Sequence, residues 1–226
     1  MRILAIDTAL GACAAAVLDS RAGAILASES AAMLRGHAEA IMPLIARVMD
    51  AARCEFHDLD RIAVTVGPGS FTGLRVGISA ARGIALAAGK PAVGLSTLAA
   101  LAAPHVAARA DHAIIAAIDA RNEQVYFQVF APNGTTIVTP RLDRVRAAVR
   151  AVPVGPTVIT GSGALLVAAH WPSGSPVPRV EDHAAPDIGW VARLGAAAQE
   201  EGAPPKPLYL RRPDARPQDA GRLPRR

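Results

Sequence analysis

A glycine-rich stretch at residues 67–77, Gly-Pro-Gly-Ser-Phe-Thr-Gly-Leu-Arg-Val-Gly, has the composition of a loop that could bind an anion. It follows an apolar run at 61–66 that is typical of a buried strand, and it precedes a helical pattern at 74–88. A strand, a glycine turn and a helix start together can aim backbone N–H groups at a phosphate. The known nucleotide motifs are nevertheless absent. Leu74 stands where a Walker loop needs lysine, and Gly69 and Gly73 enclose three residues where the dinucleotide fingerprint has two. A purely structural turn is the alternative.

Two aspartates, Asp7 and Asp119, each follow an apolar run that is typical of a buried strand. Phosphate-transferring enzymes hold magnesium with such carboxylates, and chemistry here would require the two to converge near a lysine or a further acid. The loops that would grip a nucleotide are short and lack basic partners, so we predict a vestigial cleft rather than a working one. The residues that would face a phosphate in it are Asp7, Gly67, Gly69, Ser70, Thr72 and Asp119.

The histidines, cysteines and serines do not form the pattern of another active site. His37 has no second histidine four residues later, and the other histidines are scattered along the chain. Cys13 and Cys54 are too few and too far apart for a disulfide scaffold or a zinc site. Ser70 and Ser162 lack the Gly-x-Ser-x-Gly context of a hydrolase. The sequence therefore predicts no metal site and no serine hydrolase.

The net charge of +5 is located at the C-terminal end of the chain. Residues 1–205 contain 17 Lys/Arg and 17 Asp/Glu, whereas residues 206–226 contain seven Lys/Arg and two Asp. A basic face for nucleic acid is therefore not supported in the body of the chain. We predict that the proline-rich segment 206–226 is an extended, solvated tail, with a weak contact to RNA or a partner as the alternative. No apolar run approaches the roughly 20 residues needed to cross a bilayer, so we expect a cytoplasmic protein.

The apolar pattern predicts an α/β fold made of two similar halves. In the first half we expect strands at 3–6, 13–18, 24–28 and 61–66, and helices at 37–53 and 74–88. In the second half we expect strands at 114–118, 124–130, 135–139 and 157–160, then a helix at 188–199. In each half an aspartate is followed at nearly equal spacing by a turn glycine, Gly23 or Gly134. This repetition indicates an internal duplication.

The helix expected at 74–88 carries small residues on two faces. One row continues from the glycine loop and consists of Gly73, Gly77, Ala81, Ala85 and Gly89; the other consists of Val76, Ala80, Gly83 and Ala87. A helix that lies on a sheet needs only one apolar face. Either this chain packs tightly around the helix, or another protein covers its second face. We predict the second arrangement, with helices 37–53 and 74–88 as the partner interface. The predicted interface residues are Ile41, Ile45, Val48, Met49, Val76, Ala80, Gly83 and Ile84.

Several motifs together resemble the bacterial TsaB family, once called YeaZ. They are Ile6-Asp7-Thr8, Arg35-Gly36-His37 with Pro43, the glycine loop 67–77, Ile118-Asp119-Ala120-Arg121 and Pro207-Leu208-Tyr209-Leu210-Arg211. The resemblance implies two ribonuclease-H-like halves of the actin, sugar-kinase and Hsp70 (ASKHA) type. We expect these halves at 1–105 and 106–205, with the last helix able to pack back on the first half, and a tail at 206–226.

The resemblance also implies a role and partners. Family members pair with the catalytic paralogue TsaD and work with the ATPase TsaE to place threonylcarbamoyl on N6 of adenosine 37 in tRNAs that read codons beginning with A. TsaD carries a His-x-x-x-His metal pair where this chain has Thr97 and Leu101. We therefore expect a non-catalytic partner subunit that binds no cofactor itself, with ATP and metal on the partner subunits and a possible homodimer when alone. The alternatives are a free-standing ATPase or small-molecule kinase, and a metalloprotease, which the missing histidine pair argues against.

Overall fold

Each half of the chain is organised around a mixed five-stranded sheet. The computed structural model describes residues 1–109, 111–199 and 202–211. The strand order is β3-β2-β1-β4-β5 in the first sheet and β10-β9-β6-β7-β8 in the second. The elements of the first half are β1 (Arg2–Asp7), β2 (Ala12–Asp19), β3 (Ala24–Ala32), α1 (His37–Ala51), the 3₁₀ helix η1 (Phe56–Asp58), β4 (Arg61–Gly67), α2 (Phe71–Ala88), β5 (Ala92–Ser96) and α3 (Thr97–Ala107). Those of the second half are β6 (Ala113–Asp119), β7 (Gln124–Phe130), β8 (Thr136–Arg144), α4 (Val145–Arg150), β9 (Thr157–Thr160), α5 (Ala164–Ala168), β10 (Arg179–Glu181) and α6 (Ile188–Ala197).

The two sheets repeat one topology. In the first, β1 pairs antiparallel with β2 and parallel with β4, and β5 continues the parallel side. In the second, β6 pairs antiparallel with β7 and parallel with β9, and β10 continues the parallel side. The first three strands are hairpin-connected in both halves, with left-handed turn glycines at Gly23 and Gly134. This repetition confirms the predicted duplication and the ASKHA fold class.

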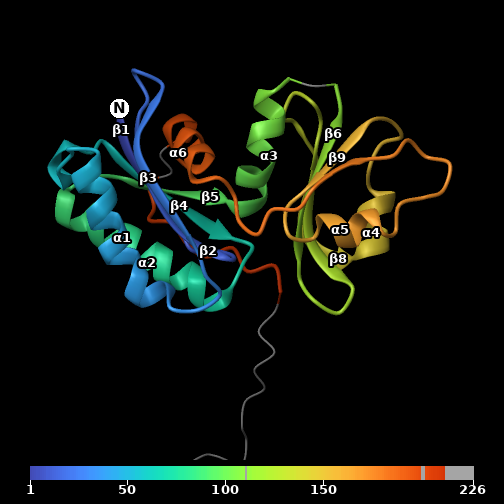
Figure 1. Ribbon diagram of the computed structural model, residues 1–226, viewed down its shortest axis with the longest axis horizontal. Coiled ribbons are helices and arrows are strands. Elements are labelled where there is room, and N and C mark those ends of the chain that lie inside the picture. The colour runs from blue at the N-terminus through green and yellow to red at the C-terminus, as the bar shows by residue number, and fades with distance from the viewer. Residues whose placement is uncertain (110, 200–201, 212–226) are drawn as a thin grey trace, which may run out of the picture.

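The helices of the two halves differ in length and in the sheet that they cover. The helix that follows the third strand is α1, with 15 residues, in the first half and α4, with six, in the second. The helix that follows the fourth strand is α2, with 18 residues, in the first half and α5, with five, in the second. Helices α1 and α2 cover one face of the first sheet, and α6 covers the other (Figure 1). Helix α3 packs on the second sheet, although it follows β5 in the chain. Helix α6, the last helix, follows the second sheet in the chain but packs on the first.

Helix α3 also bears on the expected division of the chain. Its Ala100 belongs to the core of the first half, whereas Leu98, Leu101 and Ala102 belong to the core of the second. The expected boundary between residues 105 and 106 falls inside this helix. That boundary stays a prediction, and the helix that it cuts belongs to both cores.

Two further observations concern the ends of the expected elements and the surface of the chain. Helix α2 begins at Phe71 rather than at residue 74, because the Ser70 side chain accepts a hydrogen bond from the Gly73 N–H at 3.3 Å and caps the helix. It ends where expected, at Gly89, which has a φ of 65°. Within the residues that the structure describes, no helix has the length and apolar character needed to cross a membrane.

Candidate functional site

The glycine loop is packed against the end of β1. Gly69 and Gly73 lie so close to the carbonyl oxygens of Ala9 and Thr8 that a Cβ on either glycine would overlap with them. The Ser70 N–H donates to the Ala9 carbonyl at 2.7 Å, and the Thr8 hydroxyl donates to the Gly73 carbonyl at 2.7 Å. Close approach of two backbones therefore accounts for these glycines. The Ser70 N–H is already bonded within the chain and does not point to an open anion site.

Residues 206–211, which we name the C-terminal strap, cover the other side of this loop. The Leu208 N–H donates to the Val66 carbonyl at 2.7 Å. A Cβ on Gly67 would lie 2.8 Å from the Leu208 carbonyl oxygen. The position where a nucleotide phosphate would approach Gly67 is thus filled by the chain itself. Thr72 remains exposed in the first turn of α2.

The strap continues from the loop to the second half of the molecule. The Tyr209 ring stacks on the Phe71 ring, with 5.4 Å between the ring centroids. The Arg75 guanidinium also packs on the Phe71 ring, 3.7 Å from its centroid. The Arg75 Nε–H donates to the Tyr209 hydroxyl at 3.1 Å. The Arg211 guanidinium then donates to the Ala120 carbonyl at 2.8 Å and to the Gln124 side chain at 3.0 Å. The expectation of a solvated tail is therefore wrong for residues 206–211; the rest of that segment, 212–226, lies outside the described residues.

The two candidate carboxylates have different surroundings. Asp7 is fully buried at the end of β1, where its Oδ1 accepts hydrogen bonds from the Thr65 hydroxyl and, at 3.1 Å, from the Ala9 N–H. Burial raises the pKa of the Asp7 carboxyl, and these two hydrogen bonds oppose the shift. Asp119, at the equivalent end of β6, is exposed and accepts the Arg121 N–H at 2.7 Å. Asp7 is therefore closed off from solvent, and this site does not fit magnesium and a nucleotide held between both carboxylates.

The predicted partner interface divides into buried and open residues. Ile41, Ile45, Val48, Met49 and Ile84 are buried in the core between α1, α2 and the first sheet, because their side chains point inward. Val76 and Ala80 are half-buried, and Gly83 is exposed. Only the second set faces outward, so any contact with a partner through this face uses Val76, Ala80, Gly83 and their exposed neighbours. The assignment of an interface itself stays a prediction.

The open residues of α2 border a groove that runs between α1 and α2. The groove has a volume of about 780 Å³, and residues of α1, of the segment after it and of α2 line it. Its apolar lining residues are Met42, Ala46, Met49, Phe56, Ala80, Ile84, Ala87 and Ala88. Of the large ones, Met42 is 47% exposed and Phe56 is 38% exposed. Apolar side chains of this size are thus held open to solvent beside a row of small residues.

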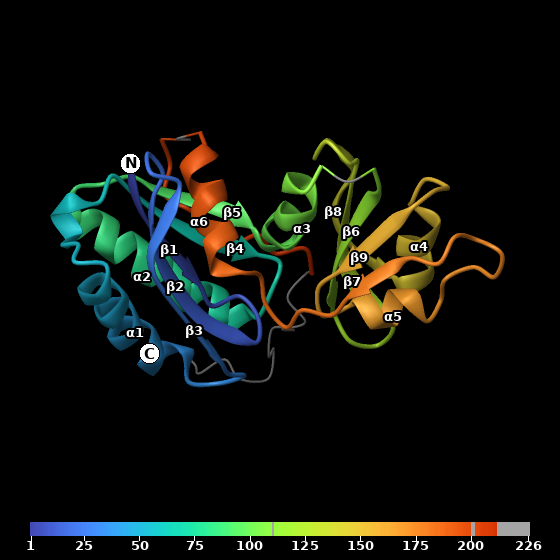
Figure 2. The ribbon, with the colours of Figure 1, turned by 45° about the horizontal axis from the view of Figure 1, so that its top comes forward.

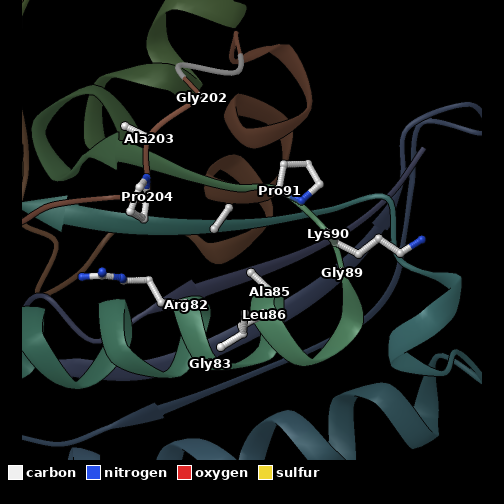
Figure 3. Close-up of a pocket in the computed structure, with 11 residues that line it drawn as sticks. Arg82, Gly83, Ala85, Leu86, Gly89, Lys90, Pro91, Gly202, Ala203 and Pro204 are labelled. Atoms are coloured by element: carbon white, nitrogen blue, oxygen red, sulfur yellow. The ribbon is translucent and has the colours of Figure 1, made fainter.

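A second hollow, of about 620 Å³, lies on the other side of α2. Figure 3 shows α2 along one side of it and the segment Gly202–Pro204 along the other. Gly83 lines both hollows. Leu86, which is 86% exposed, lines the second. The outer face of α2 therefore forms a ridge between two grooves, on which the exposed Gly83, Leu86 and Ala87 lie beside the polar Ser79 and Arg82. The strap packs on the first turns of this helix, at Phe71 and Arg75.

Sequence comparisons connect this fold with proteins of tRNA modification. Residues 25–163 match the family model described as TsaD, tRNA N6-adenosine threonylcarbamoyltransferase. The tRNA threonylcarbamoyladenosine biosynthesis protein TsaB of Escherichia coli is 39% identical over 127 residues, which span 56% of this chain and 54% of that protein. An uncharacterized protein of Mycobacterium tuberculosis is 33% identical over 215 residues, 95% of this chain and 94% of its own length. The chain belongs to the TsaB (YeaZ) family.

Solved structures agree with this assignment. The YeaZ structure from Pseudomonas aeruginosa is 26% identical, with a TM-score of 0.72, and covers 92% of this chain and 99% of its own. Another structure, of an uncharacterized protein with similarity to the peptidase YeaZ from that organism, is 28% identical with a TM-score of 0.73. The resemblance inferred from the motifs is therefore confirmed, and it extends to the whole two-sheet fold.

Thr97 and Leu101, at which we expect the metal-binding histidines of TsaD to align, lie in the core of this TsaB family member. Thr97 is fully buried at the start of α3, and Leu101 is 3% exposed one turn later. Leu101 packs beside Gly161, between α3 and the second sheet. Among the described residues, no cluster of three or more His, Cys, Asp or Glu is arranged to hold a metal ion. A side chain with the chemistry of leucine cannot replace an imidazole ligand.

The sequence did not single out the contacts that join the two halves. Besides the strap, Gly11 N–H donates to the Ala184 carbonyl at 3.2 Å. Nearby, Glu181 on β10 lies 3.4 Å from Nε2 of His105 on α3 and 3.3 Å from Nε2 of His183. The histidines are far apart in sequence and carry no motif, so only the fold could bring them together. For the strap a signal existed, because its residues form one of the motifs of the TsaB family.

Proposed function

We propose that this chain is a non-catalytic partner subunit in the formation of N6-threonylcarbamoyladenosine in tRNA, and that it binds the catalytic paralogue TsaD through the outer face of α2 and the groove beside it. The names of its TsaB relatives and of the matching family model support the pathway. The observation that carries the partner role is the ridge of α2 together with the apolar groove beside it, in which Met42 and Phe56 are exposed.

The chemistry of the ridge suits a helix of another protein. Small residues at Val76, Ala80 and Gly83 allow a second backbone to approach closely, as ridge-into-groove packing of helices requires. Met42 and Leu86 stand at its sides as exposed apolar anchors. Surfaces on which large apolar groups gather in this way are typical of protein–protein interfaces. A second copy of this chain is the alternative occupant when the partner is absent.

The glycine loop and Asp7, where a related enzyme would hold a nucleotide, support a role without catalysis. The glycine loop is filled by β1 and by the strap, and Asp7 is buried away from solvent. We expect the purified chain neither to hydrolyse ATP nor to contain about one metal ion after dialysis. ATP turnover that depends on Asp7 would favour the rival function, a free-standing ATPase or kinase, and elemental analysis tests the metal. ATP and metal are expected on the partner subunits, including the ATPase TsaE.

Substitution of neighbouring alanines on α2 tests the interface. Ala80 is half-buried on the groove side, whereas Ala81 is fully buried against the first sheet. Ala80→Glu should leave the melting temperature nearly unchanged and abolish binding to TsaD, because its charge would be desolvated only in the complex. Ala81→Glu should unfold the chain by burying an unpaired charge. Binding is measured by calorimetry with the purified paralogue.

Ala169→Glu is the matched control, since Ala169 is exposed on the second half. This variant should fold and bind like the wild-type chain. If Ala80→Glu folds and binds TsaD with unchanged affinity, α2 is not the interface. Deletion of the gene, followed by analysis of tRNA nucleosides, tests the pathway separately: threonylcarbamoyladenosine should be lost.

A further inference from the structure

Four arginines gather at the end of β8 and on α4, far from the ridge of α2. Arg141, Arg144, Arg146 and Arg150 are all exposed. They line a single hollow of about 470 Å³ together with Asp143, Ala147 and Ala151. We name these four arginines the arginine patch. Figures 1 and 2 both place α4 at the opposite end of the molecule from α1. A partner seated on α1 and α2 would therefore leave the patch open.

The charges of the patch are not neutralised by nearby carboxylates. In the described ranges, no ion pair forms between a patch arginine and an acid, whereas Arg47 and Arg179 each pair with a glutamate at 2.6 Å. Asp143 is the one acid lining the hollow, and its Oδ1 accepts the Arg144 backbone N–H at 2.7 Å. Glu123 is close in the fold, since its carbonyl accepts the Val145 N–H at 3.0 Å. Even with both acids counted, the surface keeps an excess of positive charge.

The equal numbers of acids and bases in residues 1–205 conceal this surface. The charges cancel in the sum, but the fold separates them. Arginine is suited to phosphate because its planar guanidinium offers two parallel N–H donors and carries a permanent charge. The hollow presents arginines, one aspartate and two alanines, and it lacks the aromatic or large apolar anchors on which protein interfaces depend.

We propose that the arginine patch binds the phosphate backbone of RNA. This inference rests on the proposed function, in which the RNA is the tRNA that the complex modifies. The patch recognises phosphates and carries no sequence preference of its own. Together with the ridge of α2 it lets one chain hold the catalytic paralogue at one end and the tRNA backbone at the other.

The test measures binding of the full-length chain to a transcript of a tRNA that reads a codon beginning with A, by fluorescence anisotropy over a series of salt concentrations. Each arginine–phosphate contact adds about 0.7–0.9 to the slope of log affinity against log salt. Arg144→Ala combined with Arg146→Ala and Arg150→Ala should lower this slope by about 2 and weaken binding at least about tenfold near 0.1 M salt. The corresponding three lysine substitutions should keep the salt slope, which counts charges, and lose only the part of the affinity that depends on paired guanidinium donors.

The matched control removes the same charge from another basic segment: Arg222→Ala with Arg225→Ala and Arg226→Ala. It should change the slope less than the patch variant does. The inference is overturned if the wild-type chain shows no salt-dependent binding, if the patch variant binds like the wild type, or if only the control loses affinity. It is also overturned if the patch variant keeps its RNA affinity but no longer binds TsaD, because the patch would then be a protein–protein interface. Loss of threonylcarbamoyladenosine on gene deletion tests the proposed function independently of all these outcomes.

Discussion

The glycines of α2 differ in what surrounds the position of the missing Cβ. At Gly73 a Cβ would overlap with the Thr8 carbonyl oxygen, which belongs to the backbone and cannot rotate away. At Gly83 nothing lies within 4 Å. Gly73→Ala should therefore destabilise the free chain by roughly 1–3 kcal/mol, as overpacking does. Gly83→Ala should stabilise it by about 0.5–1 kcal/mol, because alanine loses less entropy in a helix.

Thermal unfolding of the two variants checks this prediction, and each serves as the control for the other. At this chain length about 1 kcal/mol corresponds to roughly 2–4 °C in melting temperature. Equal effects of the two substitutions would mean that the glycines serve flexibility rather than the close approach of β1 and α2.

The buried carboxyl of Asp7 should make stability depend on pH. Because burial raises its pKa, the folded chain binds the proton more tightly than the unfolded chain does. The stability contributed by the protonated form is then complete below the ordinary pKa of aspartate and is lost as pH rises through the raised value. Asp7→Asn carries no charge at this position. The melting temperature of the wild type minus that of the variant should therefore fall with rising pH.

Melting curves of both proteins, recorded from below the ordinary pKa of aspartate to neutral pH, give the measurement. A difference that stays constant would contradict the raised pKa, because it would mean that Asp7 titrates alike in the folded and unfolded chain. A difference that grows with pH would show that the Asp7 carboxylate is stabilised as an anion. In that case the hydrogen bonds from Thr65 and Ala9 would outweigh desolvation.

The regular elements were predictable where one physical signal dominated. Apolar runs located β1, β4, β6 and β7 to within one or two residues, since each of these strands is buried on both faces. Helix α2 was found from its period and from Gly89. The prediction did not include α3, in which apolar residues occur all round because it is covered by two sheets. It also did not include α4 and α5, which are too short to show a helical period.

The candidate site was less predictable for a different reason. Sequence spacing indicated that a glycine turn leads from a strand into a helix within residues 67–77. The structure shows such a turn, but it is shorter than expected, because α2 already begins at Phe71. It could not show that the Thr8–Ala9 backbone and the strap fill the space around that turn, because these segments come from opposite ends of the chain. Composition alone favoured solvation of the strap, whereas its aromatic and apolar residues, Leu208 and Tyr209, hold it in place.

The strap should contribute to stability, and residues beyond it should not. A chain that ends at Arg211 keeps every contact described for the strap, so its melting temperature should match that of the full chain. A chain that ends at Pro205 loses the Leu208 hydrogen bond, the stack of Tyr209 on Phe71 and the Arg211 contacts. We expect its melting temperature to fall by about 4 °C or more, the scale of 1–2 kcal/mol.

Tyr209→Ala in the full chain tests how much of this loss of stability comes from the Tyr209 ring. Because both rings of the stack are partly exposed, the loss should be about 1 kcal/mol, less than that of the shortened chain. If the chain ending at Pro205 melts like the full chain, the strap does not stabilise the fold.

The two halves share their cores, which makes the molecule one unit in spite of its duplication. Helix α3 contributes Ala100 to the first core and Leu101 to the second. Helix α6 follows the second sheet in the chain but completes the first core with Val191 and Ala192. Unfolding of either half would therefore expose one side of α3, whose residues lie in both cores. Shared cores of this kind favour one cooperative transition over two.

This coupling predicts the response to a cavity made in either half. Leu4 is fully buried in the first core and Phe127 in the second. Leu4→Ala should cost about 2–5 kcal/mol and Phe127→Ala about 3–5 kcal/mol. In calorimetry each variant should show a single transition, lowered by roughly 5–15 °C, with no component left at the wild-type temperature. Ala169→Glu, which changes an exposed residue, is the control and should melt like the wild type. If Phe127→Ala instead splits the transition and leaves one part at the wild-type temperature, the first half folds on its own, and α3 and α6 do not couple the two halves.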